Sequence, residues 1–138
     1  MEYGNFYHLA IGVGTGKCYV IENAEDHSIP DLYEFLKETI QTGNLKYLNA
    51  FYEDENYYID ARAEGTRSYI LIHDDLNGIS YNYCNPKYTD NFDMVEVSGY
   101  EAPQICICEE PDILLEIIVS FLQTGKPCEK YEWLKNEE

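Results

Sequence analysis

Residues 45–84 read LKYLNAFYEDENYYIDARAEGTRSYILIHDDLNGISYNYC, and the main prediction about the architecture of this protein comes from this segment. Four apolar and aromatic runs in it are separated by short turns rich in Asp, Glu, Asn and Gly, which is the pattern of successive strands. We predict strands over residues 45–52, 57–63, 67–73 and 79–84. Because loops this short join antiparallel neighbours, the four strands are expected to form an up-and-down meander.

Two helices and four more strands are predicted around the meander. The first helix is expected over residues 29–42, with Ser28 as its capping residue and Gly43 at its end. The second begins at Pro111 and ends at Gly125, and it is apolar nearly all round, as a buried helix is. The further strands are expected over residues 6–13, 17–21, 94–98 and 104–108. Together these elements predict an α+β fold, one domain over residues 1–138, in which two main helices pack on an antiparallel β-sheet meander.

The charge of the chain limits what it can bind. Its 138 residues include 26 Asp and Glu against 9 Lys and Arg, which gives a net charge of -17. Contacts to phosphates need clustered Lys and Arg, so the composition argues against direct nucleic-acid binding and against an anionic membrane surface. Solubility alone asks for a net charge of about 2 to 8 in a small domain, so the excess favours a basic protein partner. Adaptation to high salt is an alternative explanation.

The sequence favours a cytoplasmic protein with reduced thiols. No apolar run approaches the roughly 20 residues that span a bilayer, and the first residues lack the basic region of a secretory signal. The number of cysteines is odd, and a chain of this length does not need disulfides to fold, so no disulfide framework is expected. The five cysteines are Cys18, Cys84, Cys106, Cys108 and Cys128.

The meander is expected to gather acidic side chains at one end of the sheet. Consecutive turns of a meander alternate between its two ends, so the turn after the first strand lies beside the turn after the third. The five carboxylates of these turns would focus a negative potential there, and two tyrosines of the second strand would supply contact area. The predicted partner-binding residues are Glu53, Asp54, Glu55, Tyr57, Tyr58, Asp74 and Asp75. The alternative is that the acids are solvated turn residues and the tyrosines are packing residues.

Enzyme chemistry is not indicated by the sequence. The three histidines are scattered, and no Ser, Cys or Thr stands in a nucleophile motif such as Gly-x-Ser-x-Gly. Cys106 and Cys108 are spaced unlike the Cys-x-x-Cys pairs of zinc sites. The segment from His73 to Asp75 is interpreted as a polar hairpin end. We therefore predict no catalytic residue, no metal and no cofactor.

The end of the chain resembles immunity protein family 1 of bacterial polymorphic toxin and contact-dependent inhibition systems. Residues 120–127 read SFLQTGKP, and Trp133 follows. Members of that family typically close with a helix ending in Phe-Leu-x-Thr-Gly, a nearby Pro and a Trp a few residues later. The order of an early helix, a meander with a tract like YYIDA at residues 57–61, and a helix that starts at Pro is similar too. The resemblance makes Gly125 and Trp133 markers of the fold, not toxin contacts.

This resemblance implies a function that agrees with the charge. Immunity proteins of this kind neutralise a cognate toxin, and the toxins are often nucleases or nucleic-acid deaminases. Such toxins hold phosphates in basic grooves, which an acidic inhibitor can occupy or flank. The leading hypothesis is an immunity protein that occludes one basic toxin domain. Two alternatives are an acidic adaptor that binds a host protein, and an enzyme or ligand-binding domain with a pocket between sheet and helices near His73.

Overall fold

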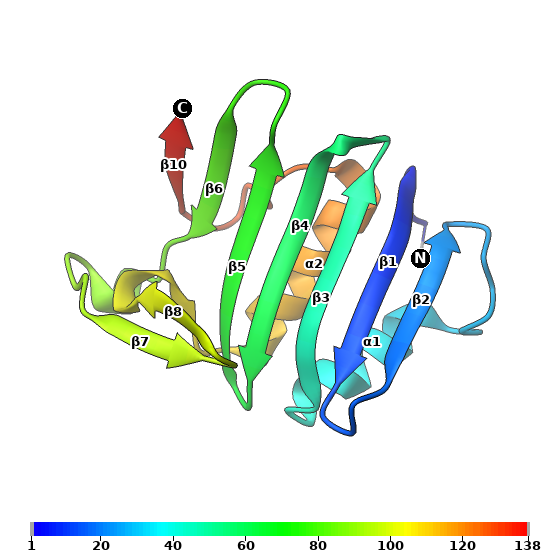
Figure 1. The fold of residues 1–138 in the computed structure, drawn as a ribbon, viewed down its shortest axis with the longest axis horizontal. Coiled ribbons are helices and arrows are strands. Elements are labelled where there is room, and N and C mark those ends of the chain that lie inside the picture. Colours follow the sequence, from blue (N-terminus) through cyan, green and yellow to red (C-terminus); the bar gives the residue numbers. More distant parts are fainter. Residues whose placement is uncertain (1, 138) are drawn as a thin grey trace.

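The computed structural model describes residues 2–137, in which two α-helices pack on one face of an antiparallel sheet of eight strands (Figure 1). The helices are α1 (Leu32–Gln41) and α2 (Pro111–Thr124). The sheet strands are β1 (Phe6–Val13), β2 (Cys18–Asn23), β3 (Leu45–Tyr52), β4 (Asp54–Glu64), β5 (Arg67–Asp74), β6 (Ile79–Tyr83), β9 (Ile107–Cys108) and β10 (Trp133–Glu137). The predicted α+β fold is confirmed.

The predicted meander forms the middle of the sheet. Its strands lie in the order β10-β6-β5-β4-β3-β1-β2, so β3 to β6 are sequential antiparallel neighbours. The hairpin of β1 and β2 extends the sheet beyond β3. On the side of β5 away from β4, the strand has two partners. Residues 71–74 of β5 pair with β6, and Ser68 and Tyr69 pair with β9.

The core lies between the sheet and the helices. Alternate residues of the strands, such as Ile59, Ala61 and Ile70, are fully buried against the apolar surface of α2. The intervening residues point to the opposite face, which neither α1 nor α2 covers (Figure 1). We call this second face the open face. Within residues 2–137, neither helix is long and apolar enough to cross a membrane.

A small hairpin covers part of the open face. It consists of β7 (Met94–Val97) and β8 (Tyr100–Pro103), and it contacts β4 and β5. Val97 and Ala102 pack on Tyr69 of the open face. The short helices η1 (Pro86–Tyr88) and η2 (Gln104–Cys106) flank the hairpin.

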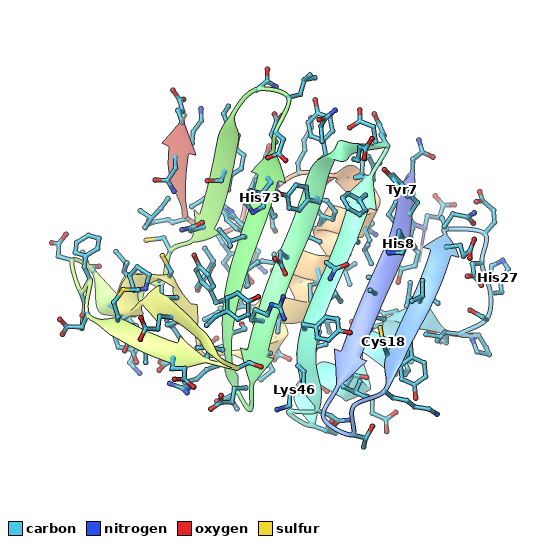
Figure 2. The ribbon with its side chains drawn as sticks, viewed as in Figure 1. Tyr7, His8, Cys18, His27, Lys46 and His73 are labelled. Carbon is cyan, nitrogen blue, oxygen red and sulfur yellow. The ribbon has the colours of Figure 1, made fainter. Side chains whose placement is uncertain are left out.

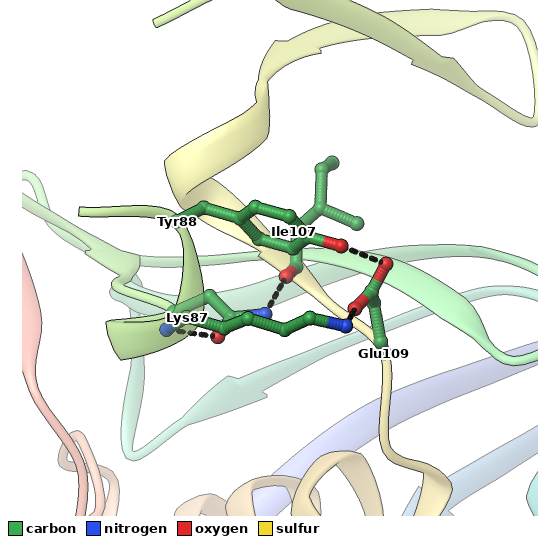
Figure 3. Close-up of polar contacts among 5 residues, drawn as sticks. Lys87, Tyr88, Ile107 and Glu109 are labelled. Carbon is green, nitrogen blue, oxygen red and sulfur yellow. Dashed lines mark hydrogen bonds and ion pairs between the residues drawn. The ribbon is translucent and has the colours of Figure 1, made fainter. Parts of the chain in front are cut away.

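A polar cluster fixes the chain where it leaves the sheet towards the hairpin. The carboxylate of Glu109 accepts hydrogen bonds from the amine of Lys87 at 3.2 Å and from the hydroxyl of Tyr88 at 2.5 Å (Figure 3). These bonds hold the pKa of Glu109 below its usual value. The side-chain amide of Asn85 donates to the carbonyl of Ile107 at 2.7 Å. The cluster is therefore structural.

Several predicted boundaries were wrong for local reasons. Helix α1 begins at Leu32, and its cap is Asp31, whose carboxylate accepts from the N–H of Glu34 at 3.1 Å; Ser28 lies outside the helix. Residues 104–106 form the short helix η2, which leaves only a two-residue strand, β9, where residues 104–108 were predicted. Ser98 and Gly99 both have positive φ and make the tight turn between β7 and β8, so a strand that was not predicted begins at Tyr100. Strand β10 was also missed.

The second helix ends as predicted. Gly125 has a φ of 72° in the left-handed region and caps α2 with its N–H bound to the carbonyl of Phe121. A side chain at Gly125 would collide with the ring of Tyr52, whose hydroxyl donates to the carbonyl of Gln123 at 3.1 Å. Trp133 is partly buried and packs against the core.

Candidate functional site

The acidic turns share one end of the sheet, as the meander predicts. Tyr57 pairs with Asp74 in the register of β4 and β5, and the N–H of Asp75 donates to the carbonyl of Asn56 at 2.8 Å. The first turn is tighter than predicted, because Asp54 and Glu55 already belong to β4. Glu53 alone stands between the strands, with a φ of 65°. We call the end that carries Glu53, Asp54, Glu55, Asp74 and Asp75 the acidic end.

Two of the five carboxylates accept hydrogen bonds within their own turns. Asp54 accepts from the N–H of Asn56 at 2.7 Å. Asp74 accepts from the N–H of Asn77 at 3.1 Å and from its side-chain amide at 2.8 Å. These bonds shape the turns, but they do not neutralise charge. None of the five ion pairs found within residues 2–137 includes a residue of the acidic end.

The two predicted tyrosine anchors lie on opposite faces of the sheet. Successive residues of a strand alternate between its faces. Tyr57 points to the helix side, where loss of solvent contact and then the charge of Asp74 raise its pKa. Tyr58 points to the open face, where its ring stacks on His73. The structure therefore does not bring Tyr57 and Tyr58 together on one surface.

Tyr57 lines a cavity of about 590 Å³ between the sheet and the segment after α2. Aromatic rings of Tyr57, Tyr81 and Trp133 contribute to its wall, and Asp74 and His73 lie at its lining as well. The ligand-binding hypothesis expected a pocket between the sheet and the helices, whereas no residue of α1 or α2 lines this cavity. The indole N–H of Trp133 is already used, since it donates to the carbonyl of Cys128 at 2.9 Å.

Four rings form a row across the open face next to the acidic end. Tyr7 of β1, Phe51 of β3, Tyr58 of β4 and His73 of β5 occupy directly paired positions on neighbouring strands. The ring centroids are 5.5 Å apart for Tyr7 and Phe51, 5.7 Å for Phe51 and Tyr58, and 4.4 Å for Tyr58 and His73. We call these four residues the aromatic row. Figure 2 shows Tyr7 and His73 on the uncovered part of the face.

The Tyr7 end of the aromatic row lies near two carboxylates of the acidic end. Loss of solvent contact, followed by the charges of Glu55 and Asp54, raises the pKa of Tyr7. The row is half-buried, so its rings present apolar surface without being part of the main core. Tyr7, Phe51 and His73 were not among the predicted site residues. Tyr7 was missed because the pairing of β1 with β3 was not predicted, whereas Phe51 and His73 belong to predicted strands and lie beside Tyr58 through the register of the meander.

The other half of the open face carries a stacked cation. The guanidinium of Arg62 lies over the ring of Tyr47 at 5.4 Å and over the ring of Tyr100 at 4.4 Å. Tyr100 comes from the β7–β8 hairpin, so this sandwich helps to hold the hairpin on the sheet. The nearest carboxylate is that of Asp60, at 3.8 Å from Nε of Arg62.

Within residues 2–137 no group of three or more His, Cys, Asp or Glu side chains is placed to hold a metal ion. All five cysteines are free thiols, and burial raises the pKa of Cys84, Cys106 and Cys108.

Comparison of the chain with protein-family models, with curated proteins and with solved structures gave no match. The resemblance to an immunity protein family therefore stays a prediction.

Proposed function

We propose that this chain is a cytoplasmic immunity protein that binds one basic toxin domain through the acidic end and the aromatic row, and blocks it by occlusion. The observation that carries the proposal is the position of the aromatic row beside carboxylates that no Lys or Arg within residues 2–137 neutralises. The resemblance of residues 120–133 to an immunity family supports the same proposal.

The two parts of the surface have different tasks. The carboxylates attract a basic partner over a distance, which raises the association rate about 10- to 1000-fold at low salt. The rings bury apolar area on contact and so slow dissociation, where most differences in affinity arise. A toxin that acts on nucleic acid has a basic groove to hold phosphates, so an inhibitor seated on that groove needs no chemistry of its own.

The test is a binding experiment with the product of the toxin-like gene expected beside the gene for this chain. We expect a stable complex by size-exclusion chromatography and loss of the toxin's activity on nucleic acid when the complex forms. A stable complex that leaves the toxin active would favour the adaptor hypothesis. Failure to bind any such neighbour would overturn the proposal.

A second candidate function follows from the cavity beside Tyr57. Its volume of about 590 Å³ is within the range of small-molecule sites, and aromatic rings form part of its wall. Trp133 is the only Trp of the chain and lines this cavity, so its fluorescence would report an occupant. A small-molecule library that leaves the emission of Trp133 unchanged would remove this candidate.

A further inference from the structure

The segment that forms the β7–β8 hairpin exposes large apolar side chains to water. Within residues 2–137 five large apolar side chains are exposed, and three of them belong to this segment: Phe92, Met94 and Tyr100. Phe92 is 62% exposed and Met94 is 58% exposed. Single exposed apolar residues are ordinary on a protein surface, whereas a contiguous group of them marks an interaction site. The hairpin is therefore a candidate contact surface.

The hairpin has an inner side, which is buried, and an outer side, which is not. Val95 and Val97 of β7 pack towards the sheet. Because side chains alternate along a strand, Met94 and Glu96 project away from the sheet. Phe92 precedes Met94 by two residues, the spacing of side chains on one side of an extended chain. The exposed apolar residues of β7 thus share the outer side with a carboxylate.

Two carboxylates face one another on this outer side. Glu96 is the cross-strand partner of Glu101, next to the pair of Met94 and Pro103. Like charges directly opposite one another on a sheet destabilise it. Neither Glu96 nor Glu101 forms an ion pair within residues 2–137. A cation supplied by another molecule would remove this repulsion.

Cations of this chain that lie along the hairpin have other partners. The guanidinium of Arg67 contacts the carboxylate of Glu64 at 3.3 Å and the backbone carbonyl of Glu96 at 3.0 Å. The amine of Lys87 pairs with Glu109 at 3.2 Å. The sequence has no Lys or Arg from residue 88 to residue 125. The outer side of the hairpin is therefore apolar and acidic, which complements a surface that is apolar and basic.

Hydrogen bonds hold the backbone that carries these side chains. The N–H of Gln104 donates to the carbonyl of Asp93 at 2.9 Å, which continues the pairing of β7 and β8 towards Phe92. At the other end of the hairpin, the N–H of Ser98 donates to the carboxylate of Glu64 at 2.9 Å. A partner would not have to order this segment, so less conformational entropy is lost when it binds.

We infer that the outer side of the hairpin is a second docking surface, whose occupant presents an apolar pocket bordered by Lys or Arg. We call this surface the hairpin patch, and it consists of Phe92, Met94, Glu96, Glu101 and Pro103. The apolar side chains enter the pocket, and the cation of the partner lies at the paired carboxylates. A second copy of this chain fits poorly, because a net charge of -17 repels another copy.

This inference rests on the proposed function, because the occupant is the same basic toxin domain. The hairpin lies on the open face, which is also the face of the aromatic row (Figure 1). A domain seated on that face can therefore contact both. The inference adds the chemistry of the contact, namely an apolar anchor beside a cation.

The first test removes the apolar anchors and measures binding to the product of the toxin-like gene expected beside the gene for this chain. Phe92→Ser is expected to weaken the complex about tenfold or more in surface-plasmon measurements, mainly through faster dissociation. Met94→Ser should have a smaller effect of the same kind. Both side chains are largely exposed, so thermal unfolding of the free variants should match the wild type. The matched control is Val20→Thr, which changes an exposed apolar side chain on the edge strand β2 and should leave the affinity unchanged.

The second test uses the paired carboxylates. Glu101→Gln removes a like-charge repulsion, so the free protein should gain about 1–3 °C in Tm. The same change should weaken the complex about threefold or more, because the cation of the partner loses a carboxylate. A residue with a purely structural role would not change stability and binding in opposite directions. Glu38→Gln, an exposed change on α1, is the control and should alter neither.

The outcomes separate this inference from the proposed function. If the wild type binds the toxin and Phe92→Ser and Met94→Ser bind as tightly as Val20→Thr, the hairpin patch is not a contact and the proposed function stands. A lower Tm of Glu101→Gln would overturn the inference, since the carboxylate would then stabilise the fold. A wild-type dimer that Phe92→Ser dissociates would identify a second copy as the occupant and overturn it as well. If the wild type binds no such toxin, the proposed function is wrong, and the inference is wrong with it.

Discussion

Asp75 and Asn56 connect the two turns of the acidic end, because the N–H of Asp75 donates to the carbonyl of Asn56 at 2.8 Å. This bond continues the ladder of β4 and β5 beyond their last paired residues, Tyr57 and Asp74. Carboxylates that repel one another are thereby held together by the backbone. The acidic end is consequently a fixed feature of the fold, and does not depend on flexible side chains finding one another.

Charge reversal at this end should slow the binding of a basic partner. Glu55→Lys and Asp75→Lys are suitable because neither carboxylate shapes a turn, unlike those of Asp54 and Asp74. We expect the double variant to associate about tenfold more slowly at low salt, with a weaker dependence on salt, in stopped-flow or surface-plasmon measurements. Glu38→Lys, an exposed change on α1, is the control. Equal rates for the double variant and Glu38→Lys would remove the acidic end from the interface.

The end of α2 should tolerate no side chain. Gly125→Ala adds a Cβ in a left-handed conformation and against the ring of Tyr52. Gly65→Ala is the comparison: Gly65 also has a left-handed backbone, with a φ of 63°, but a Cβ there would meet no neighbouring atom. We expect Gly65→Ala to lower the free energy of unfolding by about 1 kcal/mol and Gly125→Ala by about 2–4 kcal/mol in urea titrations. Similar values for both would mean that Tyr52 moves aside without cost.

The cap of α1 should be Asp31 and not Ser28. Removing a side chain that accepts from the first turn of a helix costs about 1 kcal/mol. Asp31→Ala is therefore expected to destabilise the protein by about that amount, and Ser28→Ala by a few tenths of a kcal/mol, in thermal unfolding followed by circular dichroism. A larger loss of stability for Ser28→Ala than for Asp31→Ala would instead support the helix start that the sequence predicted, with Ser28 as the cap.

The contact between Tyr131 and Glu116 should make part of the stability depend on pH. The hydroxyl of Tyr131 donates to Glu116 at 2.5 Å, and this bond, followed by that from Lys130, lowers the pKa of Glu116. A carboxyl group with a lowered pKa stabilises the folded state above its unfolded pKa, and that stabilisation is lost as the pH falls through the folded pKa. The stability difference between the wild type and Tyr131→Phe should thus shrink below about pH 4.5. A difference that stays constant from pH 7 to pH 3 would contradict this.

The thiols should differ in reactivity according to their burial. Cys18 is exposed and Cys128 partly exposed, whereas Cys84, Cys106 and Cys108 are buried with raised pKa values. With a chromogenic disulfide reagent we expect Cys18 to react first, Cys128 more slowly, and the buried three only on unfolding in guanidinium chloride. Fast reaction of all five thiols in the native protein would show that the small cluster around Cys106 opens readily.

Local patterns were enough to predict the meander, but not the aromatic row. Alternation of apolar residues and turn chemistry are encoded within a few positions, so β3 to β6 and α2 were found. In β1, Leu9 and Ile11 face the core, and simple alternation would place Tyr7 there as well. A bulge at His8, whose φ is 52°, turns Tyr7 to the open face beside Phe51. Nothing in the sequence around His8 indicates the bulge.

The errors at β10 and at the tyrosine pair also arose because residues were judged from their neighbours in the sequence. Strand β10 has no turn that ties it to a sequential neighbour, and its partner β6 lies about 50 residues earlier. Tyr57 and Tyr58 were grouped because they are adjacent in sequence, although adjacent residues of a strand face opposite ways. The turn between β7 and β8 did carry a recognisable dipeptide, Ser98-Gly99, which would have placed β8 correctly.

The chain leaves the sheet after β6 and returns to it at β9, and both of these strands lie along β5. The two ends of the segment between β6 and β9 are hydrogen-bonded to each other, since the N–H of Asn85 donates to the carbonyl of Ile105 at 2.6 Å. Residues 86–104 therefore form an insertion whose two ends lie side by side. A short linker could replace this insertion without breaking the meander. Such an excision would remove Tyr100 from Arg62 and the apolar cover of Val97 and Ala102 from Tyr69, and would enlarge the uncovered part of the open face.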